Sequence, residues 1–344
     1  MHSSGHRPNE WLCRFVWLLA SLTLLLICSG GMVTSKGVGL AVPDWPTSFG
    51  YNMFLFPVSQ WVGGIFFEHV HRLIASTIGF LTIVLAIWLW RAERRKWMQR
   101  LGFVALGAVV LQGVLGGLRV TMLKDEIGVF HACLAQAFLG LLVFIGVATS
   151  RSWAGYKGRL TAALVWLPVA TTILIYGQLG LGATMRHQHR DLSILDFPTA
   201  YGRVIPDTRA EHLAAINQWR DARALSDVTA GQIWLQMAHR AGAVLVLAGV
   251  VAYFIALRRR RDAGNHSLRL LSHIWLIGLL AQLTLGAWTI WSNKAADVAT
   301  AHVALGATML SLGVAICAIA FRLRARDATS HVQRPILREE AHAF

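Results

Sequence analysis

Eight long apolar runs constrain the fold of this 344-residue chain more than any other feature. Each run has about 20 residues, which is enough to cross the hydrocarbon core of a bilayer as a helix. A lipid-exposed backbone must satisfy its own hydrogen bonds, so the runs are expected to be helices. The sequence therefore predicts an all-α membrane protein with eight transmembrane helices, at residues 12–33, 68–90, 101–121, 129–149, 160–183, 232–256, 271–291 and 299–321.

The charges lie between these runs rather than on them. The chain is 55% hydrophobic and 14% charged, with a net charge of +15 and a mean hydropathy of +0.52. A basic surface for nucleic acid is not indicated, because the Lys and Arg residues form short clusters in alternate loops. By the positive-inside rule these loops are cytoplasmic. The N-terminal tail, 1–11, and the C-terminal tail, 323–344, are then both cytoplasmic, and the long loops 34–67 and 184–231 lie outside.

The sequence also repeats itself. Residues 43–50, Pro-Asp-Trp-Pro-Thr-Ser-Phe-Gly, are echoed by residues 195–202, Leu-Asp-Phe-Pro-Thr-Ala-Tyr-Gly. His71-Arg72 is likewise echoed by His239-Arg240. Because four crossings return the chain to the same side, the two copies are predicted to be pseudo-symmetric parallel four-helix bundles. Their predicted bounds are 12–150 for the N-terminal half and 151–322 for the C-terminal half.

Four histidines stand at matched places in the two copies. Each begins, or nearly begins, a predicted helix that starts on the outer side, so all four should lie near the outer interface: His71, His131, His239 and His302. Two imidazoles from neighbouring helices can bind a heme iron from opposite sides. A copper or zinc site usually needs additional carboxylates or thiols, which are missing here. A membrane-interface histidine that only donates hydrogen bonds is the alternative for each one.

One chemical difference separates the two copies. Glu68 lies three residues before His71 on the same helical face, and its counterpart is Gln236. A carboxylate beside only one site suggests that one site is reactive and the other passes electrons. The alternative is a plain helix N-terminal charge. Arg72 and Arg240 could contact heme propionates, or anchor the helix ends at the headgroups.

The outer loops and the glycine-rich helices carry weaker signals. Segments 43–50 and 195–202 could be lids over the two sites or ordinary structured loops. Residues 207–227 are predicted to contain an amphipathic helix on the outer surface. The glycines near Gln112 and Gln282 indicate close helix packing, with a polar contact to a cofactor left open.

These motifs together resemble those of the heme A synthase family, over most of the chain. The resemblance rests on Gly30-Gly31-Met32-Val33, Gly39-Leu40, Pro43-Asp44-Trp45-Pro46, Glu68-x-x-His71-Arg72, His131, His239-Arg240 and His302. Two departures stand out. Loop 34–67 has no cysteine, although many members carry a cysteine pair there, and Thr34 stands where relatives commonly have arginine.

The resemblance implies an oxidoreductase acting on a CH3 group. Heme O, the substrate, would lie between His71 and His131, and a heme b cofactor between His239 and His302. The C8 methyl of heme O would be oxidised to a formyl group by successive hydroxylation with water, giving heme A, with Glu68 catalytic. Implied partners are a heme O synthase as supplier, a terminal oxidase as recipient, a quinone or redox protein as electron acceptor, and the lipid of the inner (plasma) membrane. A homo-oligomer is left open.

Two other functions remain open at this point. A di-heme b-type electron carrier, resembling a subunit of a quinol oxidoreductase, would bind two equivalent hemes and would not need Glu68. A transporter or assembly factor would need no heme at all. The pigment extracted from the purified protein separates the three.

Overall fold

The computed structural model describes residues 9–156, 160–188, 192–259 and 266–332, with side chains of the last helix through Arg324. Most of the two predicted cytoplasmic tails, 1–11 and 323–344, lies outside this part of the chain. Most of the described residues are helical, and the only extended pairings within them are two isolated bridges, Ser48 with Tyr51 and Ala200 with Arg203.

The prediction of eight membrane-spanning helices is confirmed. Eight helices in the described residues are long and apolar enough to cross a bilayer: α1 Glu10–Ser35, α2 Gly63–Ala92, α3 Lys96–Met122, α4 Asp125–Thr149, α6 Ala162–His187, α8 Ala230–Arg258, α9 His266–Trp291 and α10 Ala296–Val332. The shorter elements are η1 Met53–Leu55, η2 Val58–Gln60, α5 Ser152–Gly155 and α7 Ala210–Asp221.

The second helix begins earlier than the sequence analysis expected. Gly63, with a positive φ of 54°, turns the chain into α2, and the apolar residues 65–67 form its first turn. A positive φ is readily adopted by glycine. Glu68 and His71 therefore lie within α2 rather than at its N-terminus. The helical backbone fixes the positions of both residues.

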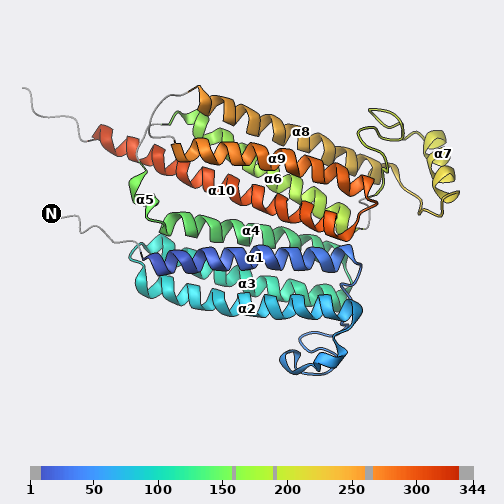
Figure 1. The fold of residues 1–344 in the computed structure, drawn as a ribbon, viewed down its shortest axis with the longest axis horizontal. Helices are drawn as coiled ribbons and strands as arrows, with labels where there is room; N and C mark the ends of the chain where they lie inside the picture. The colour runs from blue at the N-terminus through green and yellow to red at the C-terminus, as the bar shows by residue number, and fades with distance from the viewer. Residues whose placement is uncertain (1–8, 157–159, 189–191, 260–265, 333–344) are drawn as a thin grey trace, which may run out of the picture.

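The helices pack as two groups of four, each closed by contacts between its first and last members (Figure 1). In one group α1, α2, α3 and α4 contact in turn, and α1 also contacts α4. In the other, α6, α8, α9 and α10 do the same. The groups meet through α1, α4, α6 and α10. A parallel pseudo-symmetry between the groups, and the half boundaries at 150 and 322, stay predictions.

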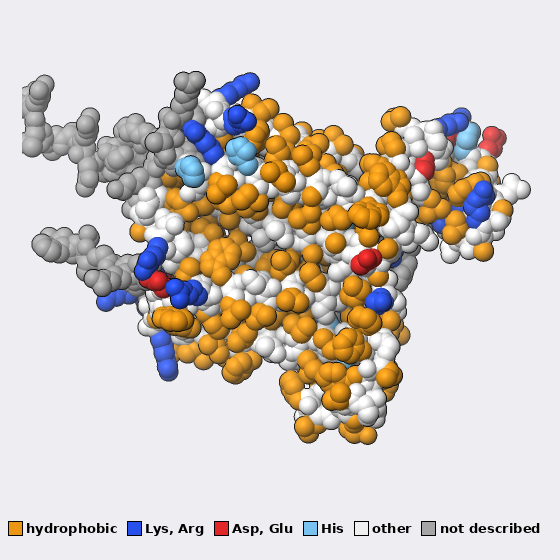
Figure 2. Space-filling model, in the orientation of Figure 1, with side chains coloured by type: hydrophobic (Ala, Val, Ile, Leu, Met, Phe, Trp, Pro, Cys, Tyr) orange, Lys and Arg blue, Asp and Glu red, His pale blue; other side chains and the backbone are white. Residues whose placement is uncertain are grey.

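Burial separates the central helices from the lipid-facing ones. In the most apolar stretch of each helix, the share of buried residues is 61% in α4 and 56% in α10, but 17% in α3. Glycines permit this close packing: Gly146 lies against Trp17, and Gly278 against Met309. The peripheral helices turn apolar side chains outward, as Figure 2 shows over much of one face.

Two loops extend from the same end of the bundle, opposite the N-terminus (Figure 1). We call residues 36–62 the first cap and residues 192–229 the second cap. The second cap contains α7, so a helix does lie within 207–227 as predicted, and its Leu213 and Ile216 pack against a small buried core. The cap residues Ile194, Ala200 and Val228 form this core with Ile233 of α8.

Candidate functional site

The candidate site residues predicted from the sequence line one cavity of about 1130 Å³. All four matched histidines line it, as do Glu68, Gln236, Arg72 and Arg240. The first cap contributes Trp45 and Pro46 to its wall, and the second cap Phe197 and Pro198. Sites for drug-sized ligands usually enclose about 300–1,000 Å³, so this space suits a larger guest or more than one.

Each histidine ring lies against a glycine of the preceding membrane-spanning helix. A Cβ added to that glycine would come within 2.9–3.3 Å of the imidazole Cε1 atom, which is too close without a shift. The four pairs are Gly30 with His71, Gly116 with His131, Gly182 with His239 and Gly286 with His302. The repeated unit is thus a two-helix hairpin in which a glycine gives space for the ring that faces it.

Three of these hairpins also hold the histidine by its backbone. The residue four positions before the glycine is a glutamine whose side-chain amide donates to the histidine carbonyl. The bonds are Gln112 to His131 (3.1 Å), Gln178 to His239 (2.6 Å) and Gln282 to His302 (2.9 Å). The matching position in α1 is Leu26, which has no donor. Sequence reasoning missed this role, because the acceptor is main chain and leaves no side-chain signature.

The geometry of the second-half pair fits two axial ligands of one iron. The ring centroids of His239 and His302 are 6.5 Å apart. Imidazole nitrogens bind a metal at about 2 Å, so two rings on opposite sides of one ion need centroids roughly 6–7 Å apart. The Nδ1 atoms of all four histidines are buried without a hydrogen-bond partner in the described chain.

The donor set favours a porphyrin over a bare ion. Nowhere in the described ranges do three or more His, Cys, Asp or Glu side chains come together as a cage. A bare zinc ion needs three or four protein ligands. Two imidazoles suffice only where the guest brings its own equatorial donors, as heme does. The residues present therefore fit a heme at each pair.

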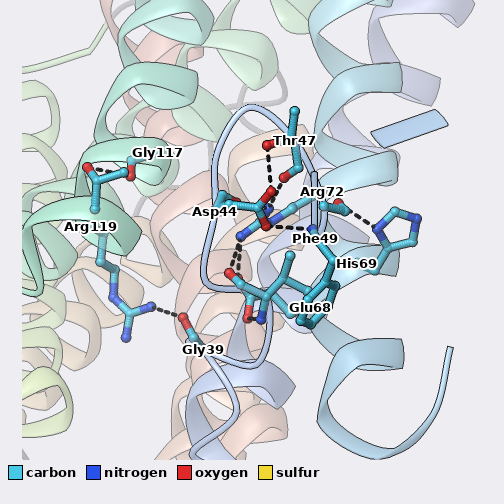
Figure 3. Close-up of polar contacts among 12 residues, drawn as sticks. Gly39, Asp44, Thr47, Phe49, Glu68, His69, Arg72, Gly117 and Arg119 are labelled. Atoms are coloured by element: carbon cyan, nitrogen blue, oxygen red, sulfur yellow. Dashed lines mark hydrogen bonds and ion pairs between the residues drawn. The ribbon is translucent and has the colours of Figure 1, made fainter. Parts of the chain in front are cut away.

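Glu68 joins the cavity wall to the first cap (Figure 3). Its side chain is buried, with Oε1 accepting from Arg72 Nη2 at 2.7 Å and Oε2 accepting from the Val42 N–H at 3.0 Å. Arg72 also donates to the carbonyls of Val42, Asp44 and Thr47. A buried ion pair is stable only with such additional bonds, so this network fixes the cap over the carboxylate.

Asp44 organises the cap itself. Its carboxylate accepts from the Thr47 hydroxyl and from the backbone N–H groups of Phe49 and Gly50, at 2.5, 2.7 and 2.9 Å. Burial raises the pKa of Asp44, but the hydrogen bonds from Gly50, Thr47 and Phe49 lower it by more. The pKa is therefore below its ordinary value. The first cap is thus a loop closed on an ionised carboxylate.

The second cap repeats this arrangement almost bond for bond. Asp196 accepts from Thr199, Tyr201 and Gly202 at 2.6, 2.8 and 3.0 Å, and its pKa is likewise lowered. Arg240 donates to the carbonyls of Asp196 and Thr199. The segments 43–50 and 195–202 therefore form matched roofs, and the lid interpretation gains support because both contribute to the cavity wall.

The exchange of glutamate for glutamine replaces the ion pair with Arg72 by a second hydrogen bond to the cap backbone. Gln236 Oε1 accepts from the Ile194 N–H at 2.7 Å, as Glu68 accepts from Val42. Its Nε2 then donates to the Ile194 carbonyl at 3.1 Å, which a carboxylate cannot do. Only the first half thus presents a negative charge at this place.

The arginines divide into two kinds. Arg72 and Arg240 were predicted as propionate contacts, and both line the cavity while their guanidinium groups bind cap carbonyls. Two further arginines line it that the sequence analysis did not select. Arg119 donates to the Gly39 carbonyl at 3.2 Å, and Arg186 donates to Gly31 and Ser35 of α1. A basic residue late in an apolar run was the signal available for both.

His69 is not among the residues that line the cavity, since its two-residue offset from His71 places it on another face of α2. It is fully buried in the first cap, with Nδ1 3.3 Å from the Ser48 hydroxyl and its ring 4.7 Å from that of Trp61. Figure 3 shows it on the far side of α2 from Arg119. Its surroundings are those of a residue that secures the cap to the helix.

Comparison with known proteins gives consistent matches over the whole bundle. A family model described as "cytochrome oxidase assembly protein" (COX15-CtaA) matches residues 13–314. A "Heme A synthase" of Shouchella clausii is 30% identical, over 68% of this chain and 79% of its own. Those of Geobacillus kaustophilus and Methylobacterium radiotolerans are 26% and 25% identical, over 83% and 91% of this chain and 85% and 90% of theirs.

Proposed function

Because the chain belongs to the COX15-CtaA family of cytochrome oxidase assembly proteins, we propose that it is a heme A synthase. It would oxidise the C8 methyl group of heme O to a formyl group. The two-site cavity, and the heme A synthase names of relatives that match most of the chain, support this function. The activity makes the protein an oxidoreductase acting on a CH3 group.

The first half would hold the substrate and the second half a cofactor. His71 and His131 would bind the iron of heme O, and His239 and His302 that of heme b. The carbonyl bonds from Gln178 and Gln282 support a permanent guest at the second pair, since they fix both ligand-bearing helices. When bound, heme b would supply a one-electron redox centre between the substrate and an external acceptor.

The oxidation needs water and a route for protons. Adding water to the methyl carbon with loss of two electrons and two protons gives an alcohol, and a second such step gives a geminal diol that loses water to the aldehyde. The histidine pairs would lie near the outer face, where solvent water is available. Glu68 would accept a proton, or stabilise positive charge developing near the methyl carbon. The Arg72 guanidinium holds the Glu68 carboxylate at the cavity wall.

The asymmetry between Glu68 and Gln236 carries this proposal. The Asp44 and Asp196 loops make matching hydrogen bonds, and the second half has Gln236 in place of the Glu68–Arg72 ion pair. The negative charge would then be the chemical difference that makes one site reactive. Glu68→Gln tests it, because the second half is a natural example of glutamine bound to the same kind of roof. We expect Glu68→Gln to retain both hemes and to yield no heme A, and Gln236→Glu to remain active. Normal heme A yield from Glu68→Gln would remove Glu68 from the mechanism.

The close match between the two roofs also favours a second candidate, a di-heme b-type electron carrier. Its two sites would be equivalent and would both hold protoheme. Extraction of the bound pigment distinguishes the two functions. A farnesylated heme beside protoheme supports the synthase, and protoheme alone supports the carrier.

The basic loops at the end opposite the caps support cytoplasmic termini in the plasma membrane, with the heme sites near the outer face. The proposed reaction then needs a heme O synthase as supplier, a terminal oxidase as recipient, and a quinone or redox protein as electron acceptor.

A further inference from the structure

The first cap exposes an apolar surface that the proposed reaction does not use. We call Phe49, Tyr51, Phe54, Leu55, Val58 and Val62 the apolar cap surface. Phe54, Leu55 and Val58 are 67%, 76% and 74% exposed. Residues 37–62 contain one charged side chain, Asp44, and its carboxylate is bound within the cap. A patch of this kind on a protein surface marks an interaction site.

The second cap provides the contrast. It carries charged side chains throughout, among them Arg203, Asp207, Arg209, Glu211 and Arg223. In Figure 1 it extends past the helix ends, along the direction of the helices. A cap that leaves the bilayer in this direction enters water, and its charges suit that environment.

The first cap lies in a different place. It projects sideways from α2, at the level of the helix ends and not beyond them (Figure 1). In the space-filling view this protrusion is orange and white, with blue and red appearing only where it joins the bundle (Figure 2). A sideways projection at this level lies in the interfacial zone of the bilayer, where amphipathic and aromatic side chains collect.

Two neighbouring features point to lipid as the occupant. Phe66 and Phe80 are exposed on α2, so the membrane-spanning helix that follows the cap also presents large apolar side chains. Lys36, at the root of the cap, stacks its ammonium group over Phe67 at 4.8 Å. A lysine whose stem lies along apolar surface places its charge at headgroup level.

We propose that the apolar cap surface docks into the leaflet on the cap side of the bilayer, as an interfacial anchor beside the transmembrane bundle. The chemistry is that of a monotopic element, with apolar side chains at the boundary between headgroups and acyl chains. Trp45, Pro46 and Met53 of the same cap line the cavity, so the anchor fixes one wall of that cavity at the lipid surface. The docking rests on the membrane-spanning fold and not on the proposed reaction.

The test measures depth at two exposed apolar residues, one in each cap. A fluorescent amino acid replaces Leu55 in one sample and Val204 of the second cap, which is 82% exposed, in the other. Each full-length protein is placed in phosphatidylcholine nanodiscs, with and without lipids that carry a nitroxide near the headgroup. We expect strong lipid quenching and weak iodide quenching at position 55, and the reverse at position 204.

Equal quenching by lipid at the two positions would overturn the proposal. So would protection of position 55 from both quenchers, with photo-crosslinking from position 55 to another polypeptide, because the occupant would then be a protein. Heme A formation is assayed on the same samples. An inactive sample with lipid-quenched position 55 would count against the proposed reaction and leave the anchor in place.

Discussion

Gln236 binds the backbone N–H of Ile194 at 2.7 Å in the place where Glu68 binds that of Val42 at 3.0 Å. The same roof contact is thus made once by an amide and once by a carboxylate. The carboxylate alone has an ion-pair partner on its own helix, Arg72, one turn away. Substitutions of Glu68 can therefore separate its contribution to the stability of the cap from its proposed role in the reaction.

Glu68→Leu should destabilise the first half much more than Glu68→Gln. Leucine leaves the Arg72 guanidinium buried without its carboxylate and the Val42 N–H without an acceptor. Loss of one partner of a buried ion pair costs about 3–5 kcal/mol. Glutamine keeps the bond to Val42 and can donate to its carbonyl, as Gln236 does to Ile194. Thermal unfolding of the purified protein in nanodiscs measures the difference; equal melting temperatures would mean that the ion pair does not hold the roof.

Gly286→Ala should disturb heme b ligation. An added Cβ would lie 3.1 Å from Cε1 of His302, so the ring of this proposed heme b ligand would have to shift. We expect a weakened low-spin Soret spectrum and a lower heme b content after purification. Gly177→Ala is the matched control, since a Cβ there meets nothing within 4 Å. If both variants kept full heme b, the glycine would not be needed for ligation.

Gln282→Leu should loosen heme b without disturbing the substrate site. The lost bond to the His302 carbonyl frees the helix segment that carries the ligand. Groups that orient a metal ligand typically change affinity by about 10–100-fold. Transfer of heme b to an apo-globin acceptor measures the rate of loss. Gln112→Leu makes the same change beside His131 and should leave that rate unaltered; an equal effect from both would indicate general loosening of the bundle.

Acid should open the roofs. The pKa values of Asp44 and Asp196 are lowered in the folded protein, chiefly because hydrogen bonds to the carboxylates outweigh burial. Their contribution to stability is therefore complete above the ordinary pKa, about 4, and is lost as the pH falls through the lower folded value. Hydrogen exchange at the Phe49 and Gly50 amides, corrected for intrinsic rates, should accelerate below about pH 4. Asp44→Asn should remove most of that dependence.

The sequence was informative where one physical constraint acts alone. Bilayer thickness sets helix length, so the apolar runs predicted eight helices. The matched histidines predicted residues that line the cavity. The bonds of Gln178 and Gln282 to histidine carbonyls could not be predicted, because any residue has a carbonyl. Nor could the sideways direction of the first cap, because bonds between residues distant in the chain, such as that of Val42 with Glu68, hold it.

The absence of a glutamine at Leu26 yields the last prediction. His71 lies in the one hairpin of the four whose first helix offers no amide to the histidine carbonyl. In the proposed function His71 binds a substrate that must leave as product. Leu26→Gln supplies the missing donor, four residues before Gly30, in the geometry of the other three hairpins. We expect slower release of product heme and a lower turnover rate, with heme b content unchanged. A net hydrogen bond of about 1 kcal/mol corresponds to a roughly five-fold slower release.

Stopped-flow transfer of heme A to an apo-globin measures this release rate. Leu25→Gln, at an exposed site on the same helix, is the control. Release at the unmodified rate from Leu26→Gln would show that the amide has no part in retaining the ligand.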